Sequence, residues 1–307
     1  MLKIKENIPL APLTTFKIGG SARYFVDVSS EKGIRESIQW ARGRGVRHIL
    51  LAGGSNVLIP DEGLDALIIK VNSLQFTVYS NTLEADAGCN LLTLIREAGK
   101  KGLGGWEKLA GIPGTIGGAV RGNAGAFGPE IKDFLVSVRA LNTDTGETRE
   151  LENKECQFAY RMSFFKKHPE WLITSVRLAL SSIDAAESKR IQEETIAERE
   201  KRHIQNVRAA GSFFINPVAT REIQEMFERE KGAESREGRV PAGWLIEKAG
   251  LKGARVGSAV ASEQHPNYLK NEGHATAKEV LALAEKIKEA VRKQFGIELR
   301  EEAVILK

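Results

Sequence analysis

Glycine is concentrated in one part of this 307-residue chain, and this concentration limits what the chain can fold into. Seven glycines lie between residues 109 and 128, in the stretch LAGIPGTIGGAVRGNAGAFG. Glycine loses more backbone freedom on folding than any other residue, so ordering this stretch carries a high entropic cost. The Gly-x-x-Gly spacing covers too short a stretch for a collagen helix. We interpret it as a loop whose backbone approaches a bound group closely, with a purely structural glycine loop as the alternative.

A second glycine turn, Gly-Gly-Ser-Asn at 53–56, directly follows the apolar run at 48–52. Consecutive backbone N–H groups in such a turn form a concave site for an anion such as a pyrophosphate. The turn is not a Rossmann fingerprint, because Pro60 and the apolar run before it prevent the helix which that motif requires. An ordinary strand-to-strand turn is the alternative. Two anion-binding loops far apart in the sequence favour an extended dinucleotide over a single phosphate.

The charge of the chain favours an anionic small molecule over nucleic acid as its partner. The formal net charge is +5 and the isoelectric point is about 9.1, but Lys and Arg are interleaved with Glu along the chain. A nucleic-acid-binding arm concentrates its basic residues instead. No stretch approaches the roughly 20 apolar residues that span a bilayer, and the first residues show no secretory signal pattern. We therefore expect a cytoplasmic protein that binds neither nucleic acid nor membranes.

The two cysteines, Cys89 and Cys156, are too few for a disulfide framework or for a four-cysteine metal site. In a cytoplasmic protein such residues are usually reduced and buried. We expect two structural thiols and no metal site.

Hydrophobic periodicity predicts helices and strands along the whole chain. Helices are expected where apolar residues recur at helical spacing between capping residues and glycines, at Glu31–Arg42, 90–99, 184–203, Arg221–Lys231, 243–249 and 276–295. Strands are expected at short apolar and β-branched runs, at 48–52, 67–71, 74–79, 82–87, 136–142, 171–180 and 297–306. The dense charge of 184–203 suggests a solvated linker helix, so we place a domain boundary at its start.

Three motifs occur in a fixed order along the chain: LTTFKIGG at 13–20, GGSN at 53–56 and GIPGTIGGAV at 111–120. In this order they resemble the UDP-N-acetylenolpyruvoylglucosamine reductase family, also called UDP-N-acetylmuramate dehydrogenases. The resemblance covers nearly the whole chain and implies an α+β fold. It implies an FAD-binding domain of the vanillyl-alcohol-oxidase type with two α+β subdomains, 1–70 and 71–183. A linker helix and an α/β substrate-binding domain then occupy 184–307.

The resemblance also implies that both glycine loops bind FAD without a covalent bond. Neither loop contains a His or Cys that could link to the flavin, and Cys89 lies well before the second loop. The implied cofactor-binding residues are Gly53, Gly54, Ser55, Asn56, Gly111, Ile112, Pro113, Gly114, Thr115, Gly117, Gly118, Asn123, Ala124 and Gly125.

The reaction implied by the resemblance reduces UDP-N-acetylglucosamine enolpyruvate to UDP-N-acetylmuramate, a step of peptidoglycan precursor synthesis. NADPH reduces FAD, and the reduced flavin gives hydride to C3 of the enolpyruvyl group; a preference for NADH over NADPH stays open. Negative charge then develops towards the substrate carboxylate, and C2 must be protonated. Such a site needs a cation or acid at the carboxylate and a proton donor near C2. We expect the enzyme to be a monomer.

Arg161 is the candidate for the carboxylate, because a guanidinium is always charged and binds carboxylates bidentately. It lies in Tyr-Arg-Met-Ser-Phe-Phe-Lys at 160–166, which is similar to the family's Tyr-Arg-x-Ser-x-Phe-Lys segment. The alternative is an Arg that extends from an aromatic loop into solvent. Met162 stands where relatives often have Asp, a difference that concerns local packing. Tyr160 is a candidate substrate-binding residue.

The resemblance implies that Ser212 is the proton donor, and the transfer is reasonable because an enolate is basic enough to take a proton from a serine hydroxyl. It lies in Gly-Ser-Phe-Phe-Ile-Asn-Pro at 211–217, which is similar to the family's Gly-Ser-x-Phe-x-Asn-Pro motif. A Ser that caps a turn is the alternative. Ile215 stands where many relatives have Lys, so the substrate-binding role implied for Asn216 is less direct.

Two adjacent carboxylates near the end of the chain, Glu301 and Glu302, compete for a third role. Neighbouring residues of a strand point to opposite faces, and the alternation of Ile297, Leu299 and Ala303 places Glu301 on the apolar face. The family pattern Leu-x-x-Glu-Val aligns its catalytic Glu with Glu302. We assign the catalytic role to Glu302, and the reverse assignment stays open.

Substrate contacts are the least specified part of the site. Lys252, in a Leu-Lys-Gly segment similar to the family's substrate domain, is a candidate for the diphosphate, with a solvated surface Lys as the alternative. The compact spacing of the last domain resembles relatives that lack a mobile substrate-covering loop. Two other functions remain open: a flavin oxidase of the same fold that acts on an alcohol or sugar, and a nucleotide-binding regulatory module without catalysis.

Overall fold

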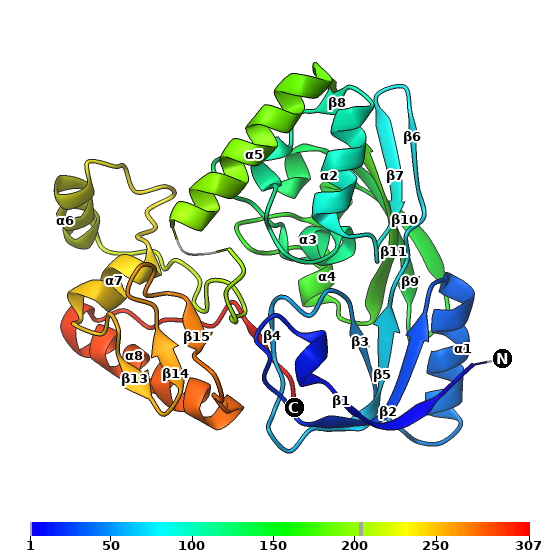
Figure 1. Cartoon of the computed structure of the whole chain (residues 1–307), viewed down its shortest axis with the longest axis horizontal. Helices are drawn as coiled ribbons and strands as arrows, with labels where there is room; N and C mark the ends of the chain where they lie inside the picture. The colour runs from blue at the N-terminus through cyan, green and yellow to red at the C-terminus, as the bar shows by residue number, and fades with distance from the viewer. Residues whose placement is uncertain (1, 203–204) are drawn as a thin grey trace. The chain divides into compact units, whose positions relative to one another are not determined.

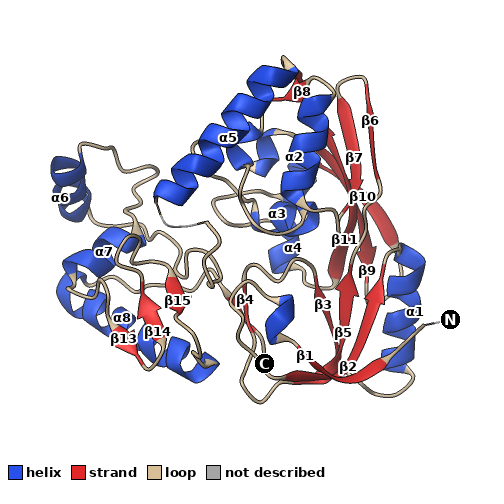
Figure 2. Ribbon diagram, viewed as in Figure 1, coloured by secondary structure: helices blue, strands red, loops and turns tan. Residues whose placement is uncertain are grey.

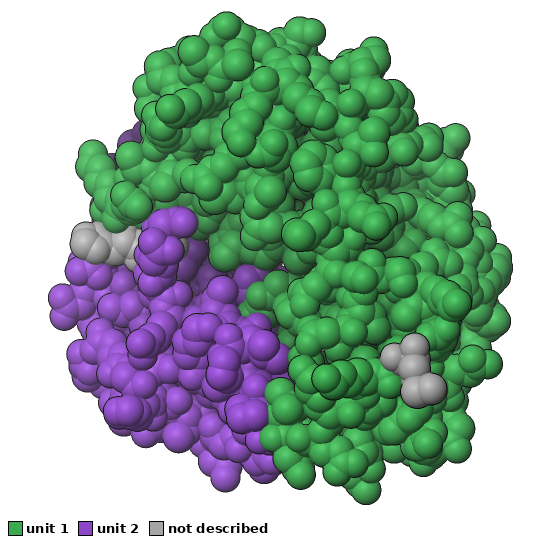
Figure 3. Space-filling view, turned by 45° about the vertical axis from the view of Figure 1, so that its right-hand side comes forward, with its two compact units in different colours: residues 1–8, 22–54, 65–201 green, residues 9–21, 55–64, 202–307 purple. Residues whose placement is uncertain are grey.

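The structure is a computed structural model that describes residues 2–202 and 205–307. The chain forms two compact units, coloured separately in Figure 3. Unit 1 comprises Met1–Ile8, Ala22–Gly54 and Asp65–Lys201, and unit 2 comprises Pro9–Ser21, Ser55–Leu64 and Arg202–Lys307. Two short segments of the N-terminal part therefore belong to the unit that contains the C-terminal part.

The first sheet of unit 1 has the strand order β1-β2-β5-β3, and helix α1 packs on it (Figure 1). Strands β3 and β5 are parallel, with Leu51 opposite Lys70. Helix α1 begins where the Ser30 side chain accepts a hydrogen bond from the Gly33 N–H at 3.2 Å. Its apolar face packs against residues of β2 and β5, as the periodicity predicts. The bounds are β1 Lys5–Pro9, β2 Ser21–Val28, α1 Glu31–Arg42, β3 His48–Leu51 and β5 Leu64–Val71.

A second sheet of unit 1 is antiparallel, with the order β10-β9-β11-β7-β6, and helices α2, α3 and α4 cover one of its faces (Figure 2). The core between them is fully apolar around Trp106 and Phe165, which are almost completely buried. The bounds are β6 Phe76–Tyr79, β7 Thr82–Asp86, α2 Leu91–Lys100, α3 Ile116–Gly122, β9 Leu135–Asn142, β10 Thr148–Glu152, α4 Phe164–Lys167 and β11 Trp171–Ala179. A short pair joins β8 (Leu103–Gly104) to β12 (Ser181–Ser182).

Helix α5 (Ala185–Lys201) packs against α2 and the 3-10 helix η2 (Glu107–Leu109), and so belongs to unit 1. The buried Ser188 hydroxyl donates to the Glu107 carboxylate at 2.7 Å, and the Gln192 amide donates to Ser188 at 3.0 Å. The dense charge of 184–203 predicts instead a solvated linker helix that belongs with the last domain. The difference has a physical reason: the buried face of α5 is polar, so hydrophobic periodicity does not reveal it.

Unit 2 holds the remaining helices around the apolar face of α8. Helix α8 begins with the predicted capping box of Thr276 and Glu279 and ends at Gly296, whose φ is 66°. Its neighbours are a three-stranded antiparallel sheet and a short parallel pair. The bounds are β4 Val57–Leu58, α6 Arg221–Lys231, α7 Ala242–Lys248, β13 Arg255–Val256, β14 Ala259–Ala261, β15 Leu269–Asn271, α8 Ala277–Phe295 and β16 Val304–Ile305.

Two predicted elements differ from the structure. The glycine-rich region contains a short helix, α3, in addition to turns, because Thr115 caps a helical turn there. The predicted closing strand 297–306 is regular only at β16; before it, a single bridge pairs Glu301 with Phe214. The other 3-10 helices are η1 (Ala11–Leu13), η3 (Ile131–Asp133) and η4 (Asn153–Cys156). None of the described helices is long and apolar enough to cross a membrane.

Candidate functional site

The two predicted flavin loops meet within unit 1 at Gly53 and Gly114. A Cβ atom added to Gly53 would lie 2.7 Å from the Gly114 Cα, closer than side-chain atoms approach backbone. Gly114 itself has a φ of +121°, a conformation that favours glycine. Its carbonyl accepts a hydrogen bond from the Leu91 N–H at 3.1 Å, at the start of α2. This close backbone packing accounts for glycine at both positions.

Helix α3 rises directly from the second loop. The Thr115 hydroxyl accepts a hydrogen bond from the Gly118 N–H at 3.3 Å and so caps the helix. The N–H groups of Ile116 and Gly117 donate to the carbonyls of Cys89 and Ala87, each at 2.9 Å. The predicted cofactor-binding residues of this turn are thus fixed onto the segment that follows strand β7.

Two half-buried cations belong to this region: Lys70 lies beside the first loop, and Arg121 lies in the second. The Lys70 ammonium donates to the carbonyl of Ala52, the residue before Gly53, and Arg121 lies in α3. Burial lowers the pKa of both groups, and Asp27 offsets part of this effect at Lys70. Within the described residues no carboxylate forms an ion pair with either cation. Buried charges in proteins are normally compensated, so the loops suit an anion such as the FAD pyrophosphate.

Sequence reasoning did not identify Lys70. It ends the apolar run of β5 and lies opposite Leu51, the last residue of β3 before the first loop. A lysine at the end of a strand paired with the loop-bearing strand is the signal that could have found it.

The side chain of Asn123 forms its hydrogen bonds with other residues of the protein. Asn123 is fully buried and has a φ of 43°, where it ends helix α3. Its amide donates to Glu130 at 2.9 Å and to the Ala159 carbonyl at 3.0 Å, and its oxygen accepts from the Lys132 N–H at 3.3 Å. Asn123 therefore connects the second loop to the segment that carries Arg161.

The Cys89 thiol is buried and donates to the Gln75 carbonyl at 3.2 Å, although its own carbonyl contacts the second loop. Burial raises its pKa to about 11, so the reactive thiolate is scarce near neutral pH. This environment fits a flavin held without a covalent bond to Cys89.

Arg161 lies at the tip of a tight turn in unit 1. Ala159 and Met162 exchange two backbone hydrogen bonds, at 3.0 and 3.1 Å, which close the turn around Tyr160 and Arg161. Arg161 has a φ of 54°, an unfavourable backbone conformation that is over-represented at functional sites. Its guanidinium donates to the Gly125 carbonyl at 3.2 Å and lies 5.4 Å from the Tyr160 ring centroid. Arg161 and a predicted cofactor-binding residue thus lie together.

The segments of Ser212 and Glu302 meet within unit 2, through Phe213. The Glu302 N–H donates to the Phe213 carbonyl at 2.8 Å. Beside it Phe214 bridges Glu301, and the Ile215 N–H donates to the Arg300 carbonyl at 2.9 Å. Ser212 directly precedes Phe213 and is partly exposed. Two of the three predicted catalytic residues are therefore joined by their backbones.

Asn56 of the first loop also belongs to unit 2. Its side-chain amide donates to the Glu302 carbonyl at 3.2 Å, and its own carbonyl accepts from the Val304 N–H at 3.0 Å. These contacts extend the parallel pair of β4 with β16.

Glu301 has a structural partner. Its carboxylate forms an ion pair with the Lys288 ammonium of α8, and this hydrogen bond raises the pKa of Lys288. Glu301 is thus already paired within unit 2.

Two of the predicted substrate-binding residues, Asn216 and Lys252, contact other residues of the protein. The Asn216 side chain accepts a hydrogen bond from the Ala242 N–H at 3.0 Å, at the first turn of α7. Lys252 is exposed and lies 3.5 Å from the Glu247 carboxylate.

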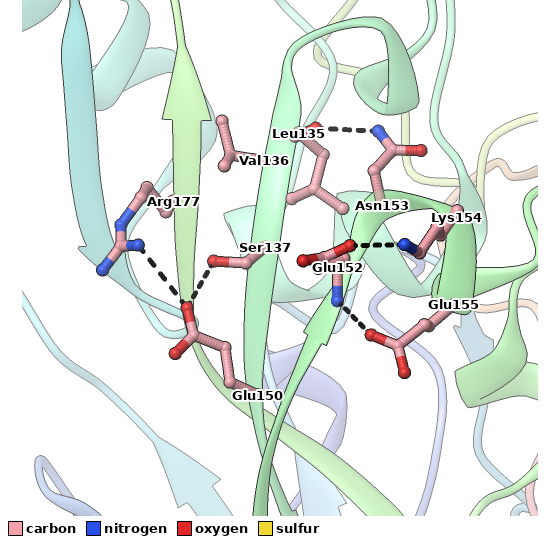
Figure 4. A pocket seen from close by; sticks show the side chains of 9 residues that line it. All are labelled: Leu135, Val136, Ser137, Glu150, Glu152, Asn153, Lys154, Glu155 and Arg177. Atoms are coloured by element: carbon pink, nitrogen blue, oxygen red, sulfur yellow. Dashed lines mark hydrogen bonds and ion pairs between the residues drawn. The ribbon is translucent and has the colours of Figure 1, made fainter.

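An open groove of about 820 Å³ lies on the five-stranded sheet, and none of its lining residues is a predicted site residue (Figure 4). Its polar side chains are paired with one another: Glu150 with Arg177 and Ser137, and Glu152 with Lys154. The third carboxylate of the groove, Glu155, accepts a hydrogen bond from the Glu152 N–H at 2.8 Å. No cluster of three or more His, Cys, Asp or Glu that could hold a metal occurs in residues 2–202 and 205–307.

Comparisons with known proteins agree with the division of the chain into two units. Residues 22–152 match the family described as FAD binding domain, and residues 202–306 match the C-terminal domain of UDP-N-acetylenolpyruvoylglucosamine reductase. The first match confirms FAD as the cofactor and the vanillyl-alcohol-oxidase type of FAD-binding fold.

Curated relatives match over nearly the whole chain. The UDP-N-acetylenolpyruvoylglucosamine reductase of Solibacter usitatus is 35% identical over 98% of this chain and 96% of its own length. That of Carboxydothermus hydrogenoformans is 37% identical over 99% and 94%. The crystal structure of the Thermus caldophilus enzyme superposes with a TM-score of 0.78 at 30% identity and covers all of both chains. The chain is therefore an FAD-dependent oxidoreductase that belongs to the UDP-N-acetylenolpyruvoylglucosamine reductase family.

Proposed function

We propose that this protein uses NADPH to reduce UDP-N-acetylglucosamine enolpyruvate to UDP-N-acetylmuramate, in the cytoplasm and as a monomer. The observation that carries the proposal is the junction at Phe213, where the backbone segments of Ser212 and Glu302 are hydrogen-bonded to one another. The relatives named for the reduction of this substrate give the substrate class.

When bound, FAD reduced by NADPH would supply the hydride for C3 of the substrate, and the two glycine loops are the residues that would hold it. The close packing of Gly53 against Gly114 leaves backbone free of side chains where the two loops meet. Lys70, beside the first loop, and Arg121, in the second, supply positive charge there, and among the described residues neither forms an ion pair with a carboxylate. The loops would therefore hold the pyrophosphate by backbone N–H groups and by charge.

Arg161 binds the substrate carboxylate. The strained turn holds its guanidinium beside the second flavin loop at Gly125, and Lys166 donates to the Arg161 carbonyl at 2.8 Å, which stabilises the turn. A fixed guanidinium stabilises the charge that develops on the carboxylate as C3 accepts hydride, without reorganisation during the reaction.

Ser212 donates the proton to C2, and Glu302 acts with it at the reacting double bond. The partial exposure of Ser212 leaves its hydroxyl accessible, and within the described part of the chain no residue forms a hydrogen bond with it. The ion pair of Glu301 with Lys288 supports Glu302 as the catalytic carboxylate, since Glu301 is already bound in the fold.

Tyr160, Asn216 and Lys252 contact the UDP-sugar in this proposal. Tyr160 lies beside Arg161, the Asn216 side chain accepts a hydrogen bond from the first residue of α7, and Lys252 is an exposed cation suited to a diphosphate. Residues 1–70 and 71–183 form the two FAD-binding subdomains. The substrate-binding part lies within 184–307.

Isotope labelling tests the proposal. In D₂O the product should carry deuterium at C2, from the proton donor, and also at C3, because hydride taken up by the flavin becomes an N–H that exchanges with solvent. Mass spectrometry and proton NMR of UDP-N-acetylmuramate distinguish these positions. Formation of no UDP-N-acetylmuramate would show that the enzyme acts on another substrate.

A further inference from the structure

The buried side chain of Asn267 fixes the segment that follows Ser212. Its oxygen accepts a hydrogen bond from the Phe214 N–H at 2.9 Å, and its amide donates to the Phe214 carbonyl at 2.8 Å. The backbone carbonyl of Asn267 also accepts from the Phe213 N–H at 2.7 Å. Asn267 is only 2% exposed. Asn267 thus satisfies backbone N–H and C=O groups of Phe213 and Phe214 that a neighbouring strand would otherwise pair.

The same two phenylalanines carry the connection to Glu302. The Phe213 carbonyl accepts from the Glu302 N–H at 2.8 Å, and Phe214 bridges Glu301. Both rings are buried and meet edge to face, with centroids 5.2 Å apart. Asn267 therefore binds on one side of this segment, and the Glu302 segment binds on the other.

We infer that Asn267 is a positioning residue for the reduction: it holds Phe213 and Phe214 so that Ser212 and Glu302 keep one fixed arrangement. This inference rests on the proposed roles of Ser212 and Glu302. The side chain of Asn267 forms its hydrogen bonds with backbone groups of Phe214 and contacts no reacting atom. Because proton transfer depends on sub-ångström placement of donor and acceptor, a small shift of the segment slows that step by about 100-fold.

The inference predicts a split between the two halves of the reaction. In Asn267→Leu, which keeps the branched arrangement of heavy atoms but forms neither hydrogen bond, flavin reduction by NADPH should keep its wild-type rate. Reoxidation of the reduced flavin by UDP-N-acetylglucosamine enolpyruvate should slow by about 100-fold. Stopped-flow absorbance of the flavin measures both rates on the intact protein.

In Asn267→Asp, a lower pH should restore the hydrogen bond to the Phe214 carbonyl and, with it, the rate of flavin reoxidation. A protonated Asp can donate to the Phe214 carbonyl as Asn267 does, whereas an ionised Asp can only accept and repels that carbonyl. The ratio of the Asn267→Asp reoxidation rate to the wild-type rate should therefore rise as the pH falls. The same ratio for Asn267→Leu should not change with pH.

Asn142→Leu is the matched control for the loss of a buried amide. Asn142 is 8% exposed, and its oxygen accepts hydrogen bonds from the N–H groups of Asp144 and Thr145, at 2.8 and 3.0 Å. It lies in the β9–β10 turn of unit 1. This variant should lower the unfolding temperature and leave both half-reactions at their wild-type rates.

Hydrogen exchange separates the inference from the proposed function. Faster amide exchange in 210–216 and 299–305 of Asn267→Leu, with no change in that of Asn142→Leu, supports the positioning role even if the substrate proves to be another. Unchanged exchange there overturns the inference. Equal slowing of both half-reactions, or of neither, also overturns it. If Asn267→Leu does not fold, Asn267→Asp decides: a rate ratio that stays flat with pH contradicts the inference.

Discussion

The side-chain amide of Asn56 donates to the backbone carbonyl of Glu302 at 3.2 Å, although the two residues lie near opposite ends of the chain. The carbonyl of Asn56 accepts from Val304 at 3.0 Å, so the contact is part of the β4–β16 pairing. A residue of the glycine turn thus holds the segment that carries the proposed catalytic carboxylate. Unit 2 therefore contains both a predicted cofactor-binding residue, Asn56, and the proposed catalytic residue, Glu302, next to the β4–β16 pair.

The two carboxylates beside this pair should respond differently to neutralisation. Glu302→Gln should slow substrate-dependent reoxidation of the flavin by about 100-fold or more, because an acid–base group contributes at least that much. Glu301→Gln should keep the reaction but lower the unfolding temperature, because it removes the partner of Lys288. Stopped-flow kinetics and thermal unfolding of both variants check this. An inactive Glu301→Gln beside an active Glu302→Gln would reverse the assignment.

Ser212→Ala tests the proton donor. Flavin reduction by NADPH should survive, because that half-reaction needs no proton at C2. Substrate-dependent reoxidation should fall by about 100-fold or more. Equal loss in both half-reactions would indicate that Ser212 supports the flavin or the fold instead.

Lys70 should contribute to FAD affinity rather than to chemistry. Lys70→Met removes the ammonium that donates to the Ala52 carbonyl and the charge beside the first loop. We expect the dissociation constant of FAD from the reconstituted apoprotein to rise by about 10-fold or more, as loss of a charged hydrogen bond does. Lys32→Met, at an exposed lysine of α1, is the control and should leave the affinity unchanged. Equal FAD affinity in wild type and Lys70→Met would contradict this role.

The two buried thiols should make stability depend on pH in the alkaline range. Burial raises the pKa of Cys89 to about 11 and that of Cys156 to about 12, above the ordinary value of 9.0. Above pH 9 the unfolded chain releases these protons first, so its free energy falls relative to the folded state. Stability should decrease by about 1.4 kcal/mol per pH unit for each thiol between pH 9 and 11.

Urea unfolding of wild type and of a Cys89→Ala, Cys156→Ala double variant at several pH values isolates this effect from other titrating groups. The difference between their free energies of unfolding should change only above pH 9. A difference that stays constant to pH 11 would show that the folded thiols ionise normally. Neither thiol should react with Ellman's reagent in the folded protein at pH 8.

Local signals in the sequence predict most of the regular elements. The cap of α2 at Asn90, the capping box of α8 at Thr276 and the end of α8 at Gly296 all lie where the residue types indicate. These contacts involve residues within a few positions of one another, so their physics is visible in a short window.

Contacts between distant segments are what the sequence did not predict. Strand β2 and the helix inside the glycine region were not predicted. The packing of α5 on Glu107 was not predicted either, because the buried face of α5 is polar. Asn267 gives no sign of its role, because its partners Phe213 and Phe214 lie far away along the chain. Side-chain hydrogen bonds to distant backbone have no periodicity to detect.

The most direct test of the proposed function is the colour of the flavin during two anaerobic additions. NADPH should bleach the purified yellow protein, and subsequent UDP-N-acetylglucosamine enolpyruvate should restore the oxidised spectrum while UDP-N-acetylmuramate forms. Bleaching by NADPH without recovery on addition of this substrate would contradict the proposed reduction. Failure of NADPH to bleach the flavin would contradict the proposed reductant.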